Sequence, residues 1–279
     1  MPNSTCSPLI NSRLPVTVVT GFTGAGKTTL LQHLLNQCPE LRTAVISGYA
    51  GPPAAAPVES SSYIYTEEKT VHLATPSGRY TLRADLLQEA GRLARDNQVE
   101  YLLVENTGPA EVEPVVRTFQ LDHPAYGLDL PRRTRLDTLV TVVDAGQFLA
   151  DWYGPVQKPT SEDKEPWFRA EVLAAQVEAA NVVVVNKTDL ASPQELSRLQ
   201  AFLRQLNPSA RLVTAAFGEV ARNELLHTGR YSPVPEEAEA VDLPAAQGIS
   251  SCRFRDVRPF HPERLWQFVR EKWPRGVLR

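Results

Sequence analysis

A lysine and a threonine stand at the end of a glycine-rich stretch near the start of the chain. Residues 16–35 read VTVVTGFTGAGKTTLLQHLL, in which Gly21, Gly26, Lys27 and Thr28 fit the spacing G-x-x-x-x-G-K-[ST]. Glycines in such a turn let successive backbone N–H groups point at a phosphate, the lysine neutralises its charge, and the threonine hydroxyl can ligate Mg²⁺. We expect the following residues to bind the phosphates: Gly21, Phe22, Thr23, Gly24, Ala25, Gly26, Lys27, Thr28 and Thr29.

The residues on either side of this turn have the patterns of a strand and a helix. An apolar, β-branched run precedes the turn, and leucines recur at helical spacing over residues 30–35. A helix that starts at this point directs the positive end of its dipole toward the same anion. This context favours a phosphate site over a chance match in a glycine-rich loop, so we interpret the chain as a nucleotide-binding protein.

A carboxylate at the end of another predicted strand is the second candidate. Residues 100–104 are apolar enough for a buried strand, and Glu105 follows them, leading into the sequence NTG. In proteins with a phosphate-binding loop, an acid in this place organises Mg²⁺ and the attacking water. The alternative is a solvated residue at a strand end. We expect Lys27, Thr28 and Glu105 to be catalytic, with Thr28 and Glu105 at the Mg²⁺.

The sequence NKTD follows a third apolar strand, NVVVV, over residues 181–185. Such a continuous apolar run is typical of parallel sheets that are covered on both faces. The carboxylate of Asp189 can accept hydrogen bonds from both N1–H and the exocyclic amine of guanine, a pair of donors that adenine lacks. Asn186 can bond the base and brace the phosphate loop, while the Lys187 stem can cover the ring. The motif therefore predicts GTP as the nucleotide, with an ATP-dependent enzyme as a remote alternative.

The remaining patterns predict an α/β fold, namely a three-layer P-loop NTPase with a mostly parallel central sheet. We expect further strands at 42–47, 137–143 and 211–214, a hairpin at 62–73, and helices at 81–96, 166–180 and 192–206. Asp144 is expected to be the N-cap of a helix that follows its strand, a structural more than a catalytic role. The Gly/Pro/Ala/Ser-rich residues 47–62 are either a nucleotide-sensing switch or an insertion.

Composition places the chain among ordinary soluble proteins. It has 279 residues, a net charge of −3 and 42% hydrophobic residues, and no apolar run is long enough to span a membrane. The absence of a basic block or a basic amphipathic helix argues against nucleic acid and membrane partners. Its three cysteines are scattered, which argues against a disulfide framework, and the polar N-terminus indicates a cytoplasmic protein.

Four segments are predicted along the chain. Residues 1–13 are expected to be a mobile tail, and residues 14–230 a P-loop GTPase domain. Residues 231–248 read as an acidic, Pro/Ala-rich linker. Residues 249–279 predict one strand and one helix, a partial α/β segment that is too small to fold alone and is expected to dock on the GTPase domain.

Several stretches together resemble the CobW-type metallochaperone GTPases, relatives of the urease and hydrogenase nickel-insertion GTPases. They are GFTGAGKTTLL, ENTGPAEVEP, VTVVDAGQFL, NKTDL and VRPFHPERLW, and the resemblance runs from about residue 14 onward. It implies a SIMIBI-class P-loop fold, Mg-dependent GTP binding, slow hydrolysis, a nucleotide-linked homodimer, and delivery of zinc or cobalt to a client protein. By matching motifs, it places residues 24–29 at the phosphates and Mg²⁺, Glu105 at the Mg²⁺ and water, and Asn186, Lys187 and Asp189 at guanine.

The chain departs from this family at the transition-metal motif. Family members carry C-x-C-C just before T-[VL]-R-x-D-L; here TLRADL is present at 81–86, but the cysteine positions hold Ser77, Gly78, Arg79 and Tyr80. We therefore expect no C-x-C-C site, and the family's N-E-F-G-E segment is replaced by SGYAG at 47–51. The resemblance also leads us to expect only part of the family's C-terminal domain in residues 249–279, and the five histidines are dispersed, a pattern that does not indicate a metal site.

Two hypotheses follow from these departures. In the first, the protein is a CobW-type GTPase that takes part in zinc or cobalt homeostasis through other ligands. In the second, it is a degenerate GTP-responsive module that acts on a partner protein without metal transfer.

Overall fold

The computed structural model describes residues 13–48, 61–66, 69–75, 78–96, 98–106, 112–121, 129–153, 167–232 and Arg264. The chain separates into two units, Met1–Tyr231 and Ser232–Arg279. Of the second unit only Ser232 and Arg264 are described. The predicted tail except for Arg13, the rest of the acidic linker and almost all of the predicted C-terminal segment therefore lie outside the described residues.

The first unit is built on a seven-stranded, fully parallel sheet with strand order β3-β2-β6-β1-β7-β8-β9. Its strands are β1 (Leu14–Thr20), β2 (Thr43–Ser47), β3 (Ser61–Tyr65), β6 (Tyr101–Glu105), β7 (Thr134–Asp144), β8 (Val182–Asn186) and β9 (Arg211–Thr214). The continuous apolar runs that predicted buried strands are the central strands of this sheet, which confirms the predicted α/β fold class.

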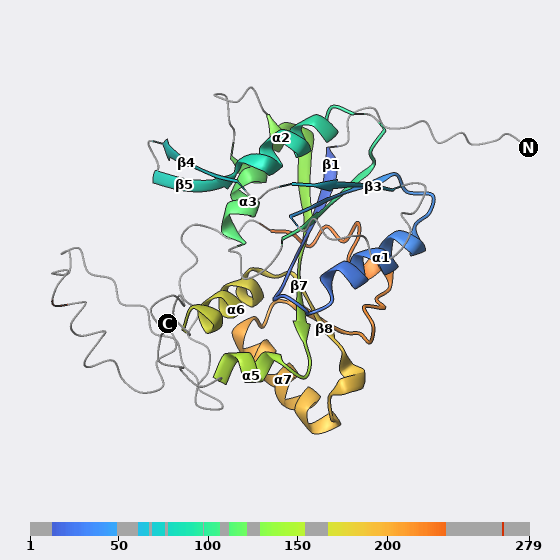
Figure 1. The fold of residues 1–279 in the computed structure, drawn as a ribbon, viewed down its shortest axis with the longest axis vertical. Helices are drawn as coiled ribbons and strands as arrows, with labels where there is room; N and C mark the ends of the chain where they lie inside the picture. Colours follow the sequence, from blue (N-terminus) through green and yellow to red (C-terminus); the bar gives the residue numbers. More distant parts are fainter. Residues whose placement is uncertain are drawn as a thin grey trace, which may run out of the picture. The chain divides into compact units, whose positions relative to one another are not determined.

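Helices cover both faces of the sheet. They are α1 (Lys27–Gln37), α2 (Ala84–Leu93), α3 (Glu113–Gln120), α4 (Leu130–Arg133), α5 (Phe148–Tyr153), α6 (Trp167–Ala179) and α7 (Pro193–Leu206), with short 3-10 helices at Thr188–Leu190 and Arg222–Glu224. Figure 1 shows α1 on one side of the sheet and α2 and α3 on the other. Alternate strand residues follow this division, since Val19 packs in the core cluster of α1 and Val18 in that of α2.

The hairpin predicted at 62–73 is wrong. β3 adds to the edge of the main sheet, parallel to β2, whereas β4 (Thr70–Thr75) pairs with β5 (Gly78–Arg83) in a separate antiparallel sheet. The alternating pattern of these residues indicates extended chain but does not specify the partner strand. The helix predicted from residue 81 starts at Ala84, because residues 81–83 belong to β5.

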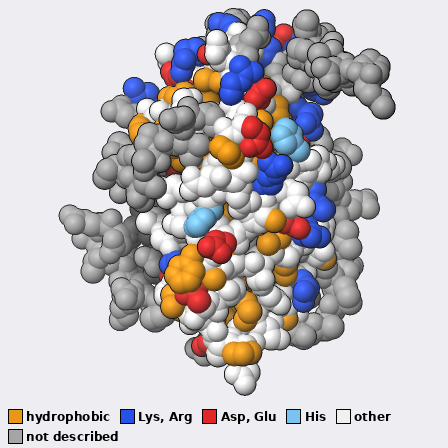
Figure 2. All heavy atoms as spheres, turned by 90° about the vertical axis from the view of Figure 1, so that its right-hand side faces the viewer, with side chains coloured by type: hydrophobic (Ala, Val, Ile, Leu, Met, Phe, Trp, Pro, Cys, Tyr) orange, Lys and Arg blue, Asp and Glu red, His pale blue; other side chains and the backbone are white. Residues whose placement is uncertain are grey.

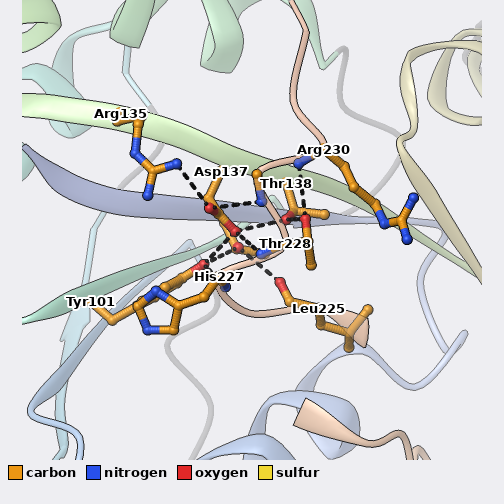
Figure 3. Close-up of polar contacts among 10 residues, drawn as sticks. Tyr101, Arg135, Asp137, Thr138, Leu225, His227, Thr228 and Arg230 are labelled. Carbon is orange, nitrogen blue, oxygen red and sulfur yellow. Dashed lines mark hydrogen bonds and ion pairs between the residues drawn. The ribbon is translucent and has the colours of Figure 1, made fainter. Parts of the chain in front are cut away.

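A buried carboxylate holds the last segment of the first unit against the edge at which the strands begin (Figure 3). Asp137, near the start of β7, is fully buried and accepts hydrogen bonds from the Tyr101 hydroxyl at 3.0 Å and from the backbone N–H groups of Thr228 at 2.9 Å and Gly229 at 3.2 Å. The guanidinium of Arg135 lies 3.3 Å from the same carboxylate. This network connects residues 228–229 to β6 and β7 at the edge where the strands begin, which is opposite the edge that carries the phosphate loop.

Candidate functional site

The glycines at both ends of the phosphate loop are required by the backbone. Gly21 has φ 137° and Gly26 has φ 99°, values that residues with a side chain rarely adopt. A Cβ atom on Gly21 would lie 2.2 Å from the carbonyl oxygen of Val142, and one on Gly26 would lie 2.3 Å from the side-chain nitrogen of Asn186. The loop can therefore approach β7 and Asn186 this closely only with glycine at both positions.

Lys27 is the cation of the loop, at the first position of α1. Its side chain is buried and donates to the carbonyl oxygens of Gly21 at 2.7 Å and Phe22 at 3.0 Å. Burial lowers the pKa of Lys27, and the nearby charge of Glu105 partly opposes this effect. A buried ammonium group gains most from an anionic ligand, because opposite charge offsets the cost of its burial.

Glu105 joins the phosphate loop to the neighbouring strands. Its buried carboxylate accepts a hydrogen bond from the Thr28 hydroxyl at 2.7 Å and another from the Ser47 hydroxyl at 2.8 Å, one on each oxygen. The register of the parallel strands places Glu105 beside Val19 of β1 and beside Ser47 of β2. The structure thus brings together the predicted pair Thr28 and Glu105, whose oxygens are of the type that Mg²⁺ prefers.

Asn186 links the phosphate loop to the loop after β9. Its amide donates to the carbonyl oxygen of Ala25 at 2.9 Å, and its side-chain oxygen accepts a hydrogen bond from the Gly218 N–H at 2.9 Å. The first contact is the one with the phosphate loop that the sequence led us to expect. Gly218 was not among the predicted site residues, because nothing in its local sequence indicates contact with Asn186.

Lys187 and Asp189 occupy the turn after β8. Lys187 has φ 59°, and its ammonium group lies 2.7 Å from the carboxylate of Asp144 at the end of β7. Asp189 lies in the following 3-10 helix with its side chain exposed. Asp144 also accepts hydrogen bonds from two backbone N–H groups of the turn at 146–147, and α5 begins only at Phe148. The predicted helix N-cap at Asp144 is therefore wrong: the residue closes a turn and pairs with Lys187.

All predicted nucleotide residues lie at or just after the carboxyl ends of β1, β6 and β8. Parallel strands that end at the same sheet edge bring residues from distant parts of the chain together there, and ligands of open α/β sheets bind in this place. Thr23, Gly24 and Thr29 are exposed, as the outer surface of a phosphate loop must be.

Within the described residues, no group of three or more His, Cys, Asp and Glu side chains is arranged to hold a metal ion. Of the positions that correspond to the family's cysteines, Gly78, Arg79 and Tyr80 lie on β5 and Ser77 is not described. In the described part of the chain, no helix is long and apolar enough to cross a membrane. On the face shown in Figure 2, acidic and basic side chains are interspersed.

This chain is similar to several known proteins. Residues 15–214 match the CobW/HypB/UreG nucleotide-binding domain. The chain is 31% identical over 297 residues to the zinc-regulated GTPase metalloprotein activator 1 of Dictyostelium discoideum, a match that covers 96% of this chain and 62% of that protein. It is 29% identical over 232 residues to the zinc chaperone CobW of Pseudomonas aeruginosa, which covers 77% of this chain and 60% of that protein.

The fold is also similar to that of a solved structure, a Zn(II)-bound triple mutant of the YjiA GTPase. The TM-score is 0.53 at 24% identity, over 79% of this chain and 63% of that chain. The chain thus spans about three fifths of the length of the curated relatives named above. Because the domain match covers most of its residues, the chain belongs to the CobW/HypB/UreG family of nucleotide-binding domains.

Proposed function

We propose that this chain binds GTP together with Mg²⁺ at the edge formed by β1, β6 and β8 and hydrolyses it slowly. The observation that carries the proposal is the hydrogen bond between Thr28 and Glu105, which lies beside the buried ammonium group of Lys27. The cation and the hydroxyl of the phosphate loop thereby lie close to a carboxylate from a separate segment, β6. Relatives named as GTPases support the proposal.

Each of these groups has a role in phosphoryl transfer. Lys27 would offset the charge that develops on the terminal phosphate, and Thr28 and Glu105 would hold Mg²⁺, with Glu105 also orienting the attacking water. When bound, Mg²⁺ supplies further stabilisation of charge on the phosphate oxygens. This arrangement catalyses by positioning and electrostatics alone, so we expect a slow intrinsic rate and activation by a partner protein.

Guanine recognition is assigned to Asn186, Lys187 and Asp189. We expect Asp189→Asn to weaken GTP binding about a hundredfold, because an amide offers one donor and one acceptor where guanine needs two acceptors. The same amide matches xanthine, which presents one N–H and one carbonyl oxygen at this edge, so xanthosine triphosphate should bind the variant more tightly than GTP. Isothermal titration with both nucleotides measures this change of preference. A variant that still prefers GTP would contradict the assignment of Asp189 to the base site.

The names of the relatives support a proposal for the cellular role. The names of the Dictyostelium and Pseudomonas proteins state a zinc-regulated metalloprotein activator and a zinc chaperone. We propose a corresponding role for this chain in zinc or cobalt homeostasis in the cytoplasm, as a homodimer that delivers the metal to a client protein. The metal would be cargo, held by ligands other than a C-x-C-C motif.

Steady-state GTP hydrolysis with Mg²⁺, in the absence and presence of stoichiometric Zn²⁺ or Co²⁺, tests this function. We expect slow turnover that Glu105→Gln reduces at least tenfold, since the amide cannot orient water as a carboxylate does. A rate that responds to one of the metals supports metal delivery. A rate that responds to neither supports the metal-free GTP-responsive module, and a wild-type rate equal to that of Glu105→Gln contradicts the GTPase assignment.

A further inference from the structure

A buried ion pair lies behind the proposed catalytic carboxylate, at the junction of β5 and α2. Arg83 and Asp85 have side chains only 5% and 6% exposed, and the guanidinium donates two hydrogen bonds to the carboxylate, from Nε at 2.9 Å and from Nη2 at 2.7 Å. Burial opposes ionisation of Asp85, but hydrogen bonds and charge from Arg83 outweigh it and lower the pKa of the carboxyl below its ordinary value. Asp85 therefore remains a carboxylate at neutral pH.

Arg83 extends this pair to the strand that carries Glu105. Its Nη1 donates to the side-chain oxygen of Asn106 at 3.3 Å, and Asn106 is fully buried directly after Glu105. The backbone N–H of Asn106 donates to the carbonyl oxygen of Val19 in β1 at 2.9 Å. Arg83 thus holds the residue that connects Glu105 to the strand of the phosphate loop.

Asp85 is linked to the Glu105 carboxylate by a second route, through Thr66 and Ser47. It accepts a hydrogen bond from the Thr66 hydroxyl at 2.8 Å, and the Thr66 N–H donates to the carbonyl oxygen of Ser47 at 3.0 Å. Ser47 in turn donates its hydroxyl to Glu105. These hydrogen bonds, together with the peptide bond between Glu105 and Asn106, form a closed ring, which runs in order through Arg83, Asn106, Glu105, Ser47, Thr66 and Asp85.

We propose that Arg83 and Asp85 are positioning residues for Glu105, which hold its carboxylate toward the phosphate loop through this closed ring. The inference rests on the proposed GTPase function and adds residues to it that touch neither nucleotide nor Mg²⁺. A buried ion pair contributes little net stability, because desolvation cancels most of its attraction. It does fix geometry, and a displacement of about 1 Å at a catalytic group can lower a rate by about a hundredfold.

The ring also connects the β4–β5 sheet to the site. Arg83 is the last residue of β5, and its backbone N–H donates to the Thr118 hydroxyl of α3 at 3.0 Å. The N–H of Ala84 donates to the carbonyl oxygen of Lys69, just before β4, at 2.7 Å. The β4–β5 sheet is thus connected to Glu105 through Arg83 and Asn106.

The test replaces both charges, as Arg83→Met with Asp85→Leu, so that no unpaired charge is left buried. We expect kcat for GTP hydrolysis to fall about tenfold. The Mg²⁺ concentration for half-maximal rate should rise, while the Kd for GTP measured without Mg²⁺ stays within twofold of wild type. The matched control is Arg92→Met with Glu89→Leu, which removes an exposed ion pair on the same helix and should leave all three quantities unchanged.

The outcomes separate this inference from the proposed function. Wild-type protein without Mg-dependent hydrolysis overturns both. An active wild type with a folded double variant of equal kcat and equal Mg²⁺ requirement overturns the positioning role alone, as does a Kd for GTP that weakens in proportion to kcat. If the double variant does not fold, Thr66→Val breaks the ring at one hydroxyl and should shift kcat and the Mg²⁺ requirement in the same direction by a smaller factor.

Discussion

Replacing Lys27 with alanine should weaken GTP binding by at least a hundredfold. The buried ammonium group now donates to two carbonyl oxygens of its own loop, and phosphate oxygens are stronger acceptors for the same donors. Hydrogen bonds to charged groups contribute about 1.5–3 kcal/mol each, so losing two of them removes at least about 3 kcal/mol of binding free energy. Isothermal titration of the variant with GTP and Mg²⁺ measures the loss.

The pH dependence of GTP binding gives an internal control for this variant. Burial lowers the pKa of Lys27 from its ordinary 10.5, and phosphate binds the charged form. Wild-type affinity should therefore fall as pH rises through the lowered pKa, before pH 10.5, and by a larger factor than the residual affinity of Lys27→Ala, which follows only the loss of the guanine N1–H at alkaline pH. The variant also loses the cost of burying a charge, so it should remain folded. Unchanged affinity in a folded variant would contradict the phosphate site.

Replacing Asp137 with alanine should cost about 3–5 kcal/mol of stability. The change leaves the backbone N–H groups of Thr228 and Gly229 and the Tyr101 hydroxyl without their acceptor in the interior. Burial, with a further contribution from the Asp137 charge, raises the pKa of Tyr101, so its hydroxyl remains a proton donor throughout the physiological range. Thermal unfolding should show a decrease in Tm of roughly 10 °C.

The matched control for Asp137 is its exposed partner. Arg135 has a side chain 43% exposed, and solvent can replace its contact with the carboxylate. Arg135→Ala should therefore change stability by less than about 1 kcal/mol. A similar loss for both variants would mean that the ion pair, and not the acceptor role of the carboxylate, anchors residues 228–229.

The phosphate loop could be predicted from the sequence because its determinants are local. Gly21, Gly26 and Lys27 lie within one turn, and the strand and helix around them have clear periodicities. The helix at Pro193–Leu206 could be predicted from the sequence for the same reason, since Ser192 and Glu195 form a capping box at its start. In each case the residues that specify the structure are also neighbours in the chain.

The rest of the site depends on strand pairing, which local sequence does not encode. Ser47 meets Glu105 only because β2 and β6 are adjacent in the sheet, and Gly218 meets Asn186 only because β9 follows β8. The hairpin predicted at 62–73 was wrong for the same reason, since β3 pairs with β2 at the sheet edge. Arg83 stands in a recognisable TLRADL motif, yet only the three-dimensional structure shows that it contacts Asn106.

The most direct measurement of the central claim is the titration of the wild-type protein with GTP and with ATP in the presence of Mg²⁺. We expect one site that binds GTP at least a hundredfold more tightly than ATP, because Asp189 can accept hydrogen bonds that only guanine offers. Equal affinity for the two nucleotides, or no binding of GTP, would contradict a guanine-nucleotide site at this edge of the sheet.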